Sequence, residues 1–250
     1  MKKTLLATTI ILAFMISSAN AKNYTHADVE WGEDLVCEKD SNGEEVSCEV
    51  LLLDAATRKP LTGNFQHYHE NGALHWTIEY KEGKKDGEER LYDDKGNLIS
   101  KTQYTHNLQT GDDIAYHPNG ILSSKSHYKD GRLDGEAIDF DEDGTMTNEK
   151  FYKNGKQEGI QKTHYSKTGG LLSEETYVNG KREGVRKAYS REGILVEETT
   201  FKNGQLDGVS KNYHPKTKKL LRERVFKNGK LISGWTYDKD GNKTAIDVKK

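Results

Sequence analysis

An internal repeat of 24 residues constrains this chain more than any other feature. The repeat starts lie 24 or 25 residues apart, at Tyr80, Tyr104, Tyr128, Tyr152, Tyr177, Phe201 and Phe226. A fixed period of this length is typical of repeat architectures, in which each unit packs mainly against its neighbours. We therefore expect an array of about seven similar units, the last of them shortened, rather than one compact core.

Each unit holds two aromatic residues about 12 positions apart, and each aromatic is followed by a turn. The first turn carries Gly83, Gly131, Gly155, Gly180, Gly204 and Gly229, with Asn107 in the remaining copy. Asn, like Gly, tolerates a left-handed backbone, so this slot has a conformational reason. An acidic or polar residue and a second Gly follow, as in Glu183-Gly184.

Two Gly turns in 24 residues exclude a continuous helix and favour one β-hairpin per repeat. We predict an all-β fold: an elongated single-sheet meander of hairpins over residues 61–241, led in by a half-unit that contains Tyr68 and Leu74. The Tyr and Leu side chains are expected to pair on one face as the core, with Lys, Glu, Arg and Ser on the other. Trp76 and Trp235 are expected to close the two ends of the array.

Residues 22–60 and 242–250 fall outside the repeat and are interpreted as an N-terminal cap and a C-terminal tail. The cap holds Trp31 and the only two cysteines, Cys37 and Cys48. An even count in an exported chain predicts a disulfide, and the Asn42-Gly43 turn signal would place the two cysteines on facing strands. A metal pair is the alternative, although no further thiol could complete a structural zinc site.

Residues 1–21 have the pattern of a cleavable bacterial signal peptide. Lys2 and Lys3 precede an apolar stretch, Leu5 to Ile16, that is too short to span a bilayer. The small residues Ala19 and Ala21 predict cleavage after Ala21, and the absence of a following cysteine argues against a lipid anchor. We expect a periplasmic or secreted protein without a transmembrane segment.

Charge and motifs limit the function further. The net charge is −2, the charges are interspersed, and no basic block is present, so neither nucleic acid nor an anionic membrane is an expected partner. No G-x-S-x-G elbow or phosphate-binding P-loop occurs, and the carboxylates recur in register with the repeat. We expect a monomeric protein that is not an enzyme and has no cofactor.

Two clusters admit a metal as well as a structural explanation. His67 and His69 flank Tyr68 on an expected strand, and His75 returns from the hairpin, so the three could form an imidazole site or simply a solvated polar face. Asp139, Asp141 and Asp143 match the first half of a calcium-binding EF-hand loop, but Lys150 stands where that loop needs a Glu. The same aspartates occupy the second-turn slot of the repeat, which explains them without calcium.

The repeat itself resembles a known family. YVNGKREGVRKAYSREGILVEE, Tyr177 to Glu198, resembles the variant MORN repeat of bacterial proteins, and the lead-in KPLTGNFQHYHENGAL resembles the opening of the YwqK-family antitoxins. The resemblance implies a non-catalytic protein-binding module, and specifically an antitoxin or immunity protein that neutralises a toxin by direct binding. The alternative is a structural repeat protein associated with the envelope or the membrane.

Residues that differ between repeats on the polar face are the expected contacts for a protein partner. These are Arg182, Arg186, Arg191, Lys211 and Arg222. Such surface charges mainly set association rate and partner choice. We therefore expect Arg186→Glu to weaken a complex at nearly unchanged stability, and Tyr189→Ala to destabilise the fold.

Overall fold

The computed structural model describes residues 23–31, 36–39, 45–49 and 51–248, and the predicted signal peptide lies outside them. The described residues form two compact units, an N-terminal unit that ends at Gly120 and a C-terminal unit that begins at Ile121. The described residues contain strands and one short 3-10 helix, η1 (His26–Asp28), and the prediction of an all-β fold built from hairpin repeats is confirmed.

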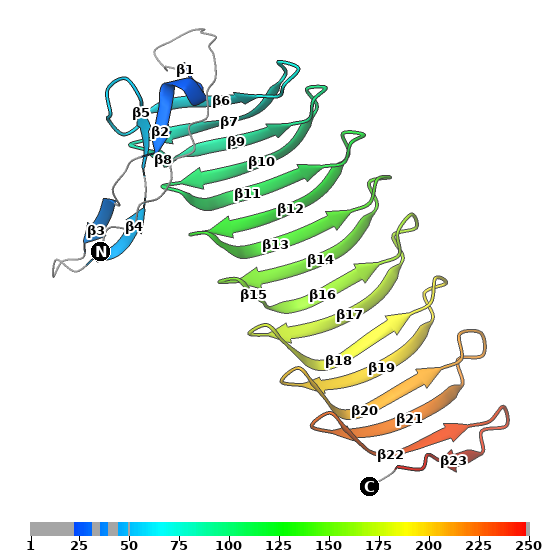
Figure 1. Cartoon of the computed structure of the whole chain (residues 1–250). Coiled ribbons are helices and arrows are strands. Elements are labelled where there is room, and N and C mark those ends of the chain that lie inside the picture. The colour runs from blue at the N-terminus through cyan, green and yellow to red at the C-terminus, as the bar shows by residue number, and fades with distance from the viewer. Residues whose placement is uncertain (1–22, 32–35, 40–44, 50, 249–250) are drawn as a thin grey trace. The chain divides into compact units, whose positions relative to one another are not determined.

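The N-terminal unit consists of a meander and two small two-stranded sheets (Figure 1). Its meander strands pair as consecutive antiparallel neighbours: β6 (Gly63–Tyr68), β7 (Leu74–Lys81), β8 (Lys84–Lys85), β9 (Gly87–Tyr92), β10 (Leu98–Thr105) and β11 (Leu108–Tyr116). The small sheets pair β2 (Val29–Trp31) with β5 (Leu52–Asp54), and β3 (Val36–Lys39) with β4 (Glu45–Glu49).

The C-terminal unit is an antiparallel meander throughout. Its strands are β12 (Leu122–Lys129), β13 (Arg132–Phe140), β14 (Met146–Lys153), β15 (Lys156–Gln157), β16 (Gly159–His164), β17 (Leu171–Val178), β18 (Lys181–Tyr189), β19 (Leu195–Lys202), β20 (Gln205–Tyr213), β21 (Leu220–Lys227), β22 (Lys230–Tyr237) and β23 (Lys243–Ala245). Strand β23 lies inside the predicted tail, because Lys243 to Ala245 pair with β22.

The predicted cap also contributes to the meander. Strand β1 (Asn23–Tyr24) pairs with β6 in parallel, with Tyr24 opposite Phe65. Cys37 lies opposite Cys48 in the β3–β4 pair, on facing strands as predicted. Their side chains and that of Trp31 lie outside the described residues, so the disulfide stays a prediction.

The first turn of each repeat has two consecutive residues with positive φ. Asn179 and Gly180 have φ of 51° and 78°, and Asn203 and Gly204 have 50° and 83°. This is the geometry of a type I′ turn, whose twist matches that of the strands it joins. The N–H groups of Gly155, Gly180, Gly204 and Gly229 each donate to a carbonyl of the preceding repeat, as Gly180 does to Gln157 at 2.8 Å.

The acidic residue before the second Gly caps the turn of the following repeat. The carboxylate of Glu183 accepts a hydrogen bond from the backbone N–H of Asn203 at 2.8 Å, 20 residues along the chain. The same bond joins Asp134 to Asn154, Glu158 to Asn179, and Asp207 to Asn228. This inter-repeat bond explains why a carboxylate recurs at that slot.

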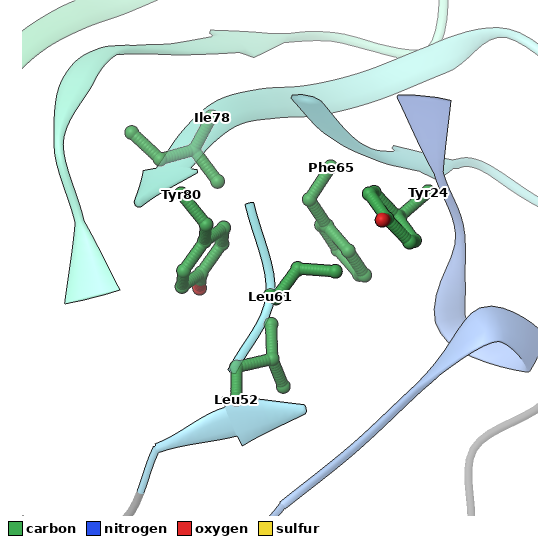
Figure 2. Packing of buried hydrophobic residues seen from close by; sticks show 6 residues of the cluster. All are labelled: Tyr24, Leu52, Leu61, Phe65, Ile78 and Tyr80. Atoms are coloured by element: carbon green, nitrogen blue, oxygen red, sulfur yellow. The ribbon is translucent and has the colours of Figure 1, made fainter. Parts of the chain in front are cut away.

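The buried apolar core belongs to the N-terminal unit, where the predicted cap meets the first hairpin (Figure 2). It consists of Tyr24, Leu52, Leu61, Phe65, Ile78 and Tyr80. Leu61 is fully buried, and its N–H and C=O bond Leu52 and Gly83. Trp76 packs against this core with its ring 4.9 Å from that of Phe65, so it contributes to the core of its unit.

The expectation of a buried Tyr and Leu stripe along one face is wrong for the C-terminal unit. Phe201 lies opposite Gly184, whereas Tyr189 stands five residues beyond Gly184 on the same strand. Because side chains alternate along a strand, an odd separation puts the two aromatic slots on opposite faces. The most buried residues of this unit are small or polar: Ala137, Gln161, Ser173, Thr199 and Ser210.

Candidate partner-binding surface

One face of the C-terminal unit carries a ladder of alternating charge. The strands from β14 to β21, except the two-residue strand β15, contribute one directly opposed residue each: Glu149, Lys162, Glu174, Lys187, Glu198, Lys211 and Glu223. The Lys162 ammonium lies 2.7 Å from Glu149, and that of Lys187 lies 3.4 Å from Glu174. Opposite charges directly across a strand pair stabilise the register. We call this side of the unit the ladder face.

Two tyrosines of the second aromatic slot bond glutamates of the ladder. The Tyr189 hydroxyl donates to Glu174 at 3.1 Å, and that of Tyr213 donates to Glu198 at 2.7 Å. Burial, together with the Glu198 hydrogen bond and charge, raises the pKa of Tyr213 to about 12. These tyrosines therefore hold the glutamates in place and keep their own protons.

A row of exposed apolar side chains runs beside the ladder, two residues away along each strand. Ile160, Val185 and Val209 are 60%, 46% and 38% exposed, and they lie opposite Thr176, Thr200 and Val225. Residues two apart on a strand share a face, so this row belongs to the ladder face. Phe151 is also exposed, and it lies two residues along β14 from the ladder residue Glu149, so it belongs to the same row.

Arg182 and Arg186 lie on the opposite face and bond side chains of the chain itself. Arg186 contacts Glu197 at 3.0 Å and Glu175 at 3.8 Å, and Arg182 contacts Glu175 at 2.8 Å. The Arg182 guanidinium also packs over the ring of Phe201 at 5.3 Å. These contacts hold repeats together, so both arginines have an intramolecular role that the sequence pattern did not reveal.

The structure does not gather the five predicted contact residues on one face. Lys211 belongs to the ladder face, whereas Arg222 lies opposite Asn212 and so on the other side. Arg191 sits in the β18–β19 turn, with its guanidinium 5.0 Å from the ring of Tyr165. The expectation that Arg186→Glu leaves stability unchanged needs correction, because a third carboxylate would stand beside Glu175 and Glu197.

The carboxylate of Asp141 accepts hydrogen bonds within two turns of the chain. It accepts hydrogen bonds from the N–H groups of Asp143 and Thr145 in its own turn, and from Ser166 and the N–H of Lys167. The Ser166 bond, followed by the backbone bonds, lowers the pKa of Asp141 to about 2. This arrangement favours the turn interpretation of the Asp139–Asp143 segment over a calcium loop.

The three histidines of the first hairpin do come together. Nδ1 of His67 lies 3.0 Å from Nδ1 of His75, and the rings of His69 and His75 are 4.2 Å apart. Burial, and the neighbouring His69, lower the pKa of His75. Within the ranges that the structure describes, no three His, Cys, Asp or Glu side chains converge on a common metal position.

A shallow depression in the N-terminal unit is lined by Asn64, Gln66, Thr77, Glu79, Glu88 and Arg90. The only cation that lines it, Arg90, is bonded to Glu88.

The part of the chain with assigned structure contains no helix long and apolar enough to cross a membrane.

Comparison with known proteins identifies the repeat. No curated protein matches the chain. Two crystal structures, of TcdB2-TccC3-Cdc42 and of TcdB2-TccC3 without its hypervariable C-terminal region, align with 86% of this chain and 14% of their own, at 12% and 13% identity and a TM-score of 0.18. Four segments, residues 85–106, 110–130, 133–154 and 182–203, match the MORN repeat variant, and the chain thus carries at least these four copies of that repeat.

Proposed function

We propose that this chain is an exported, non-catalytic repeat protein that acts by binding another protein, and that the ladder face is the contact surface. The observation that carries the proposal is the row of exposed apolar side chains beside the charge ladder. Exposed apolar residues gathered in one row mark an interaction surface more often than the same residues scattered singly.

The charge ladder suits a binding role because each charge lies directly opposite a residue of the other sign, and Glu149–Lys162 and Glu174–Lys187 are ion pairs. A binding protein that covers Val185 and Val209 meets alternating charges of opposite sign, and it need not supply a counter-charge for each one. Alternating charges also set which orientation of a partner is tolerated, since a like-charge contact is costly. Affinity would then come from the apolar row and specificity from the ladder.

The finer proposal is an antitoxin or immunity role in the periplasm. It rests on the signal-peptide pattern of residues 1–21 and on the resemblance of residues 59–74 to the opening of YwqK-family antitoxins. The partner would be an exported toxin that the mature chain neutralises stoichiometrically.

A paired substitution tests the contact surface. Val185→Asp combined with Val209→Asp adds two charges to the apolar row at exposed positions. The double variant should bind the proposed toxin partner about 10-fold or more weakly than the wild type does. Thr236→Asp is the matched control, because it adds a carboxylate on the opposite face, across from Arg222. If all variants keep the wild-type circular dichroism spectrum and bind equally well, the ladder face is not the contact surface.

The immunity role has its own test. A deletion strain exposed to sibling cells that carry the neighbouring gene product should be killed, and the wild-type gene should restore survival. Full survival of the deletion strain, with no protein recovered on the tagged mature chain, would reject the immunity role.

A further inference from the structure

The histidine cluster of the first hairpin is used by neither the repeat nor the proposed contact surface. His67 stands on β6, His69 directly follows that strand, and His75 stands on the facing strand β7. The three side chains are only partly buried, so an ion from solvent can reach them. They lie beside Trp76, whose ring stacks on that of His67 at 5.9 Å.

The spacing of two nitrogens suits chelation. Nδ1 of His67 and Nδ1 of His75 are 3.0 Å apart. For a metal ion about 2.1 Å from each of these nitrogens, the N–metal–N angle would be about 90°. Such an angle fits the adjacent positions of a square-planar or tetragonal ion better than the wider angle of tetrahedral zinc. Cu²⁺ and Ni²⁺ both take this geometry with imidazole ligands, and Cu²⁺ binds the more tightly of the two.

The third histidine is oriented by the backbone. Nε2 of His69 lies 3.0 Å from the carbonyl oxygen of Tyr92. A carbonyl only accepts, so Nε2 carries the proton and Nδ1 of His69 carries a lone pair. A carbonyl that fixes the tautomer of a histidine in this way is a common support for metal-binding imidazoles. The 4.2 Å separation from the His75 ring leaves a short movement for His69 to complete the site.

We propose that His67 and His75, with His69 as a third ligand after a small side-chain rotation, bind one Cu²⁺ ion per chain. When the ion binds, the N–H proton between His67 and His75 moves through solvent to Nε2 of the ring that carries it, so that both Nδ1 atoms offer a lone pair. Water fills the remaining equatorial position. The site is independent of the ladder face, and a failure of either proposal leaves the other standing.

Trp76 provides the readout, because a bound Cu²⁺ ion quenches the fluorescence of a nearby indole. Titration of the full-length mature protein with Cu²⁺ should quench part of the tryptophan emission at one equivalent, and electron paramagnetic resonance should show nitrogen ligands. His67→Ala and His75→Ala should each weaken binding by about 10-fold or more, since even a supporting partner of a ligand is worth that much. His69→Ala should alter the resonance spectrum while partial binding persists.

His127→Ala is the matched control, because His127 is an exposed strand histidine of the C-terminal unit. It should bind Cu²⁺ as the wild type does. Should an alanine variant lose its fold by circular dichroism, His67→Asn and His75→Asn replace it with a polar side chain of similar size. Unchanged quenching in folded His67 and His75 variants, or nitrogen signals that persist in both, would overturn the proposal.

Discussion

At the scale of the residue, the carboxylate before the second glycine acts across repeats. Glu183 accepts from the N–H of Asn203, so Glu183→Ala leaves the turn of the next repeat without its acceptor. We expect a loss of about 1 kcal/mol in the free energy of unfolding, typical of one hydrogen bond. Urea denaturation measures it, and Glu183→Gln, which retains an acceptor oxygen, should lie close to the wild type. An equal loss in both variants would contradict the capping role.

Two glycines of the same slot should respond differently to alanine. A Cβ at Gly208 would lie 2.9 Å from Cβ of Thr200, whereas a Cβ at Gly184 would have no neighbour within 4 Å. Both have positive φ, 122° and 81°, so both variants carry backbone strain, and Gly208→Ala adds a steric clash. In thermal unfolding, the Tm of Gly208→Ala should be lower than that of Gly184→Ala. The reverse order would show that the steric clash at Gly208 does not determine stability.

The raised pKa of Tyr213 predicts a loss of stability in alkali. Its folded-state pKa of about 12 exceeds the ordinary value of 10, so between these values the folded chain binds more protons than the unfolded one. The free energy of unfolding then falls as pH rises from 10 towards 12. Glu198→Gln should bring the pKa of Tyr213 closer to 10 and reduce that fall, as an ultraviolet titration against Tyr213→Phe would measure. An unchanged Tyr213 titration in Glu198→Gln would leave burial and the charge of Glu223 as the causes.

Sequence pattern was informative for the turns and less so for the side chains that they serve. The Asn-Gly pairs predicted hairpins because only a few residues tolerate two consecutive positive φ angles. The partner of Glu183 stands 20 residues away, and only the register of paired strands reveals it. The histidine cluster was visible as a possibility, but the 3.0 Å approach of His67 and His75 depends on the β6–β7 pairing.

At the scale of the element, the repeat predicted the meander strands, and it could not predict the elements outside the period. Strand β1 has two residues and pairs in parallel with β6, and β23 has three. Neither carries an alternating pattern long enough to read. The faces were also misassigned, because strands with odd separations between slots send Phe201 and Tyr189 to opposite sides.

The β3–β4 pair yields a prediction at this scale. Because Cys37 stands opposite Cys48, the two cysteines are expected to form a disulfide in the exported protein. A bond that closes a loop of this size should stabilise by about 2 to 3 kcal/mol. Thiol labelling of unreduced protein should find no reactive cysteine, and two labelled thiols would rule the bond out.

At the scale of the whole molecule, apolar burial is unevenly distributed along the chain. The cluster around Leu61 and Ile78 buries large apolar side chains, whereas the buried positions of the C-terminal unit are mostly small or polar, such as Thr199 and Ser210. Composition alone could not reveal this, because Tyr and Leu recur in every repeat and only the predicted cap residues Tyr24 and Leu52 complete a core. Stability should therefore be local, as in other arrays whose repeats contact mainly their neighbours.

Leu61→Ala tests that view. Leu61 is fully buried, so its truncation should cost about 2 to 5 kcal/mol through lost burial and the cavity left behind. In an array, that cost should stay near the site: hydrogen exchange should accelerate in β6 and β7, while amides of β20 to β22, far along the chain, keep their protection. Val209→Ala, at an exposed position of β20, is the control. It should change the free energy of opening in either region by no more than about 0.5 kcal/mol. A uniform loss of protection from β6 to β22 in Leu61→Ala would show instead that the chain unfolds as one cooperative unit.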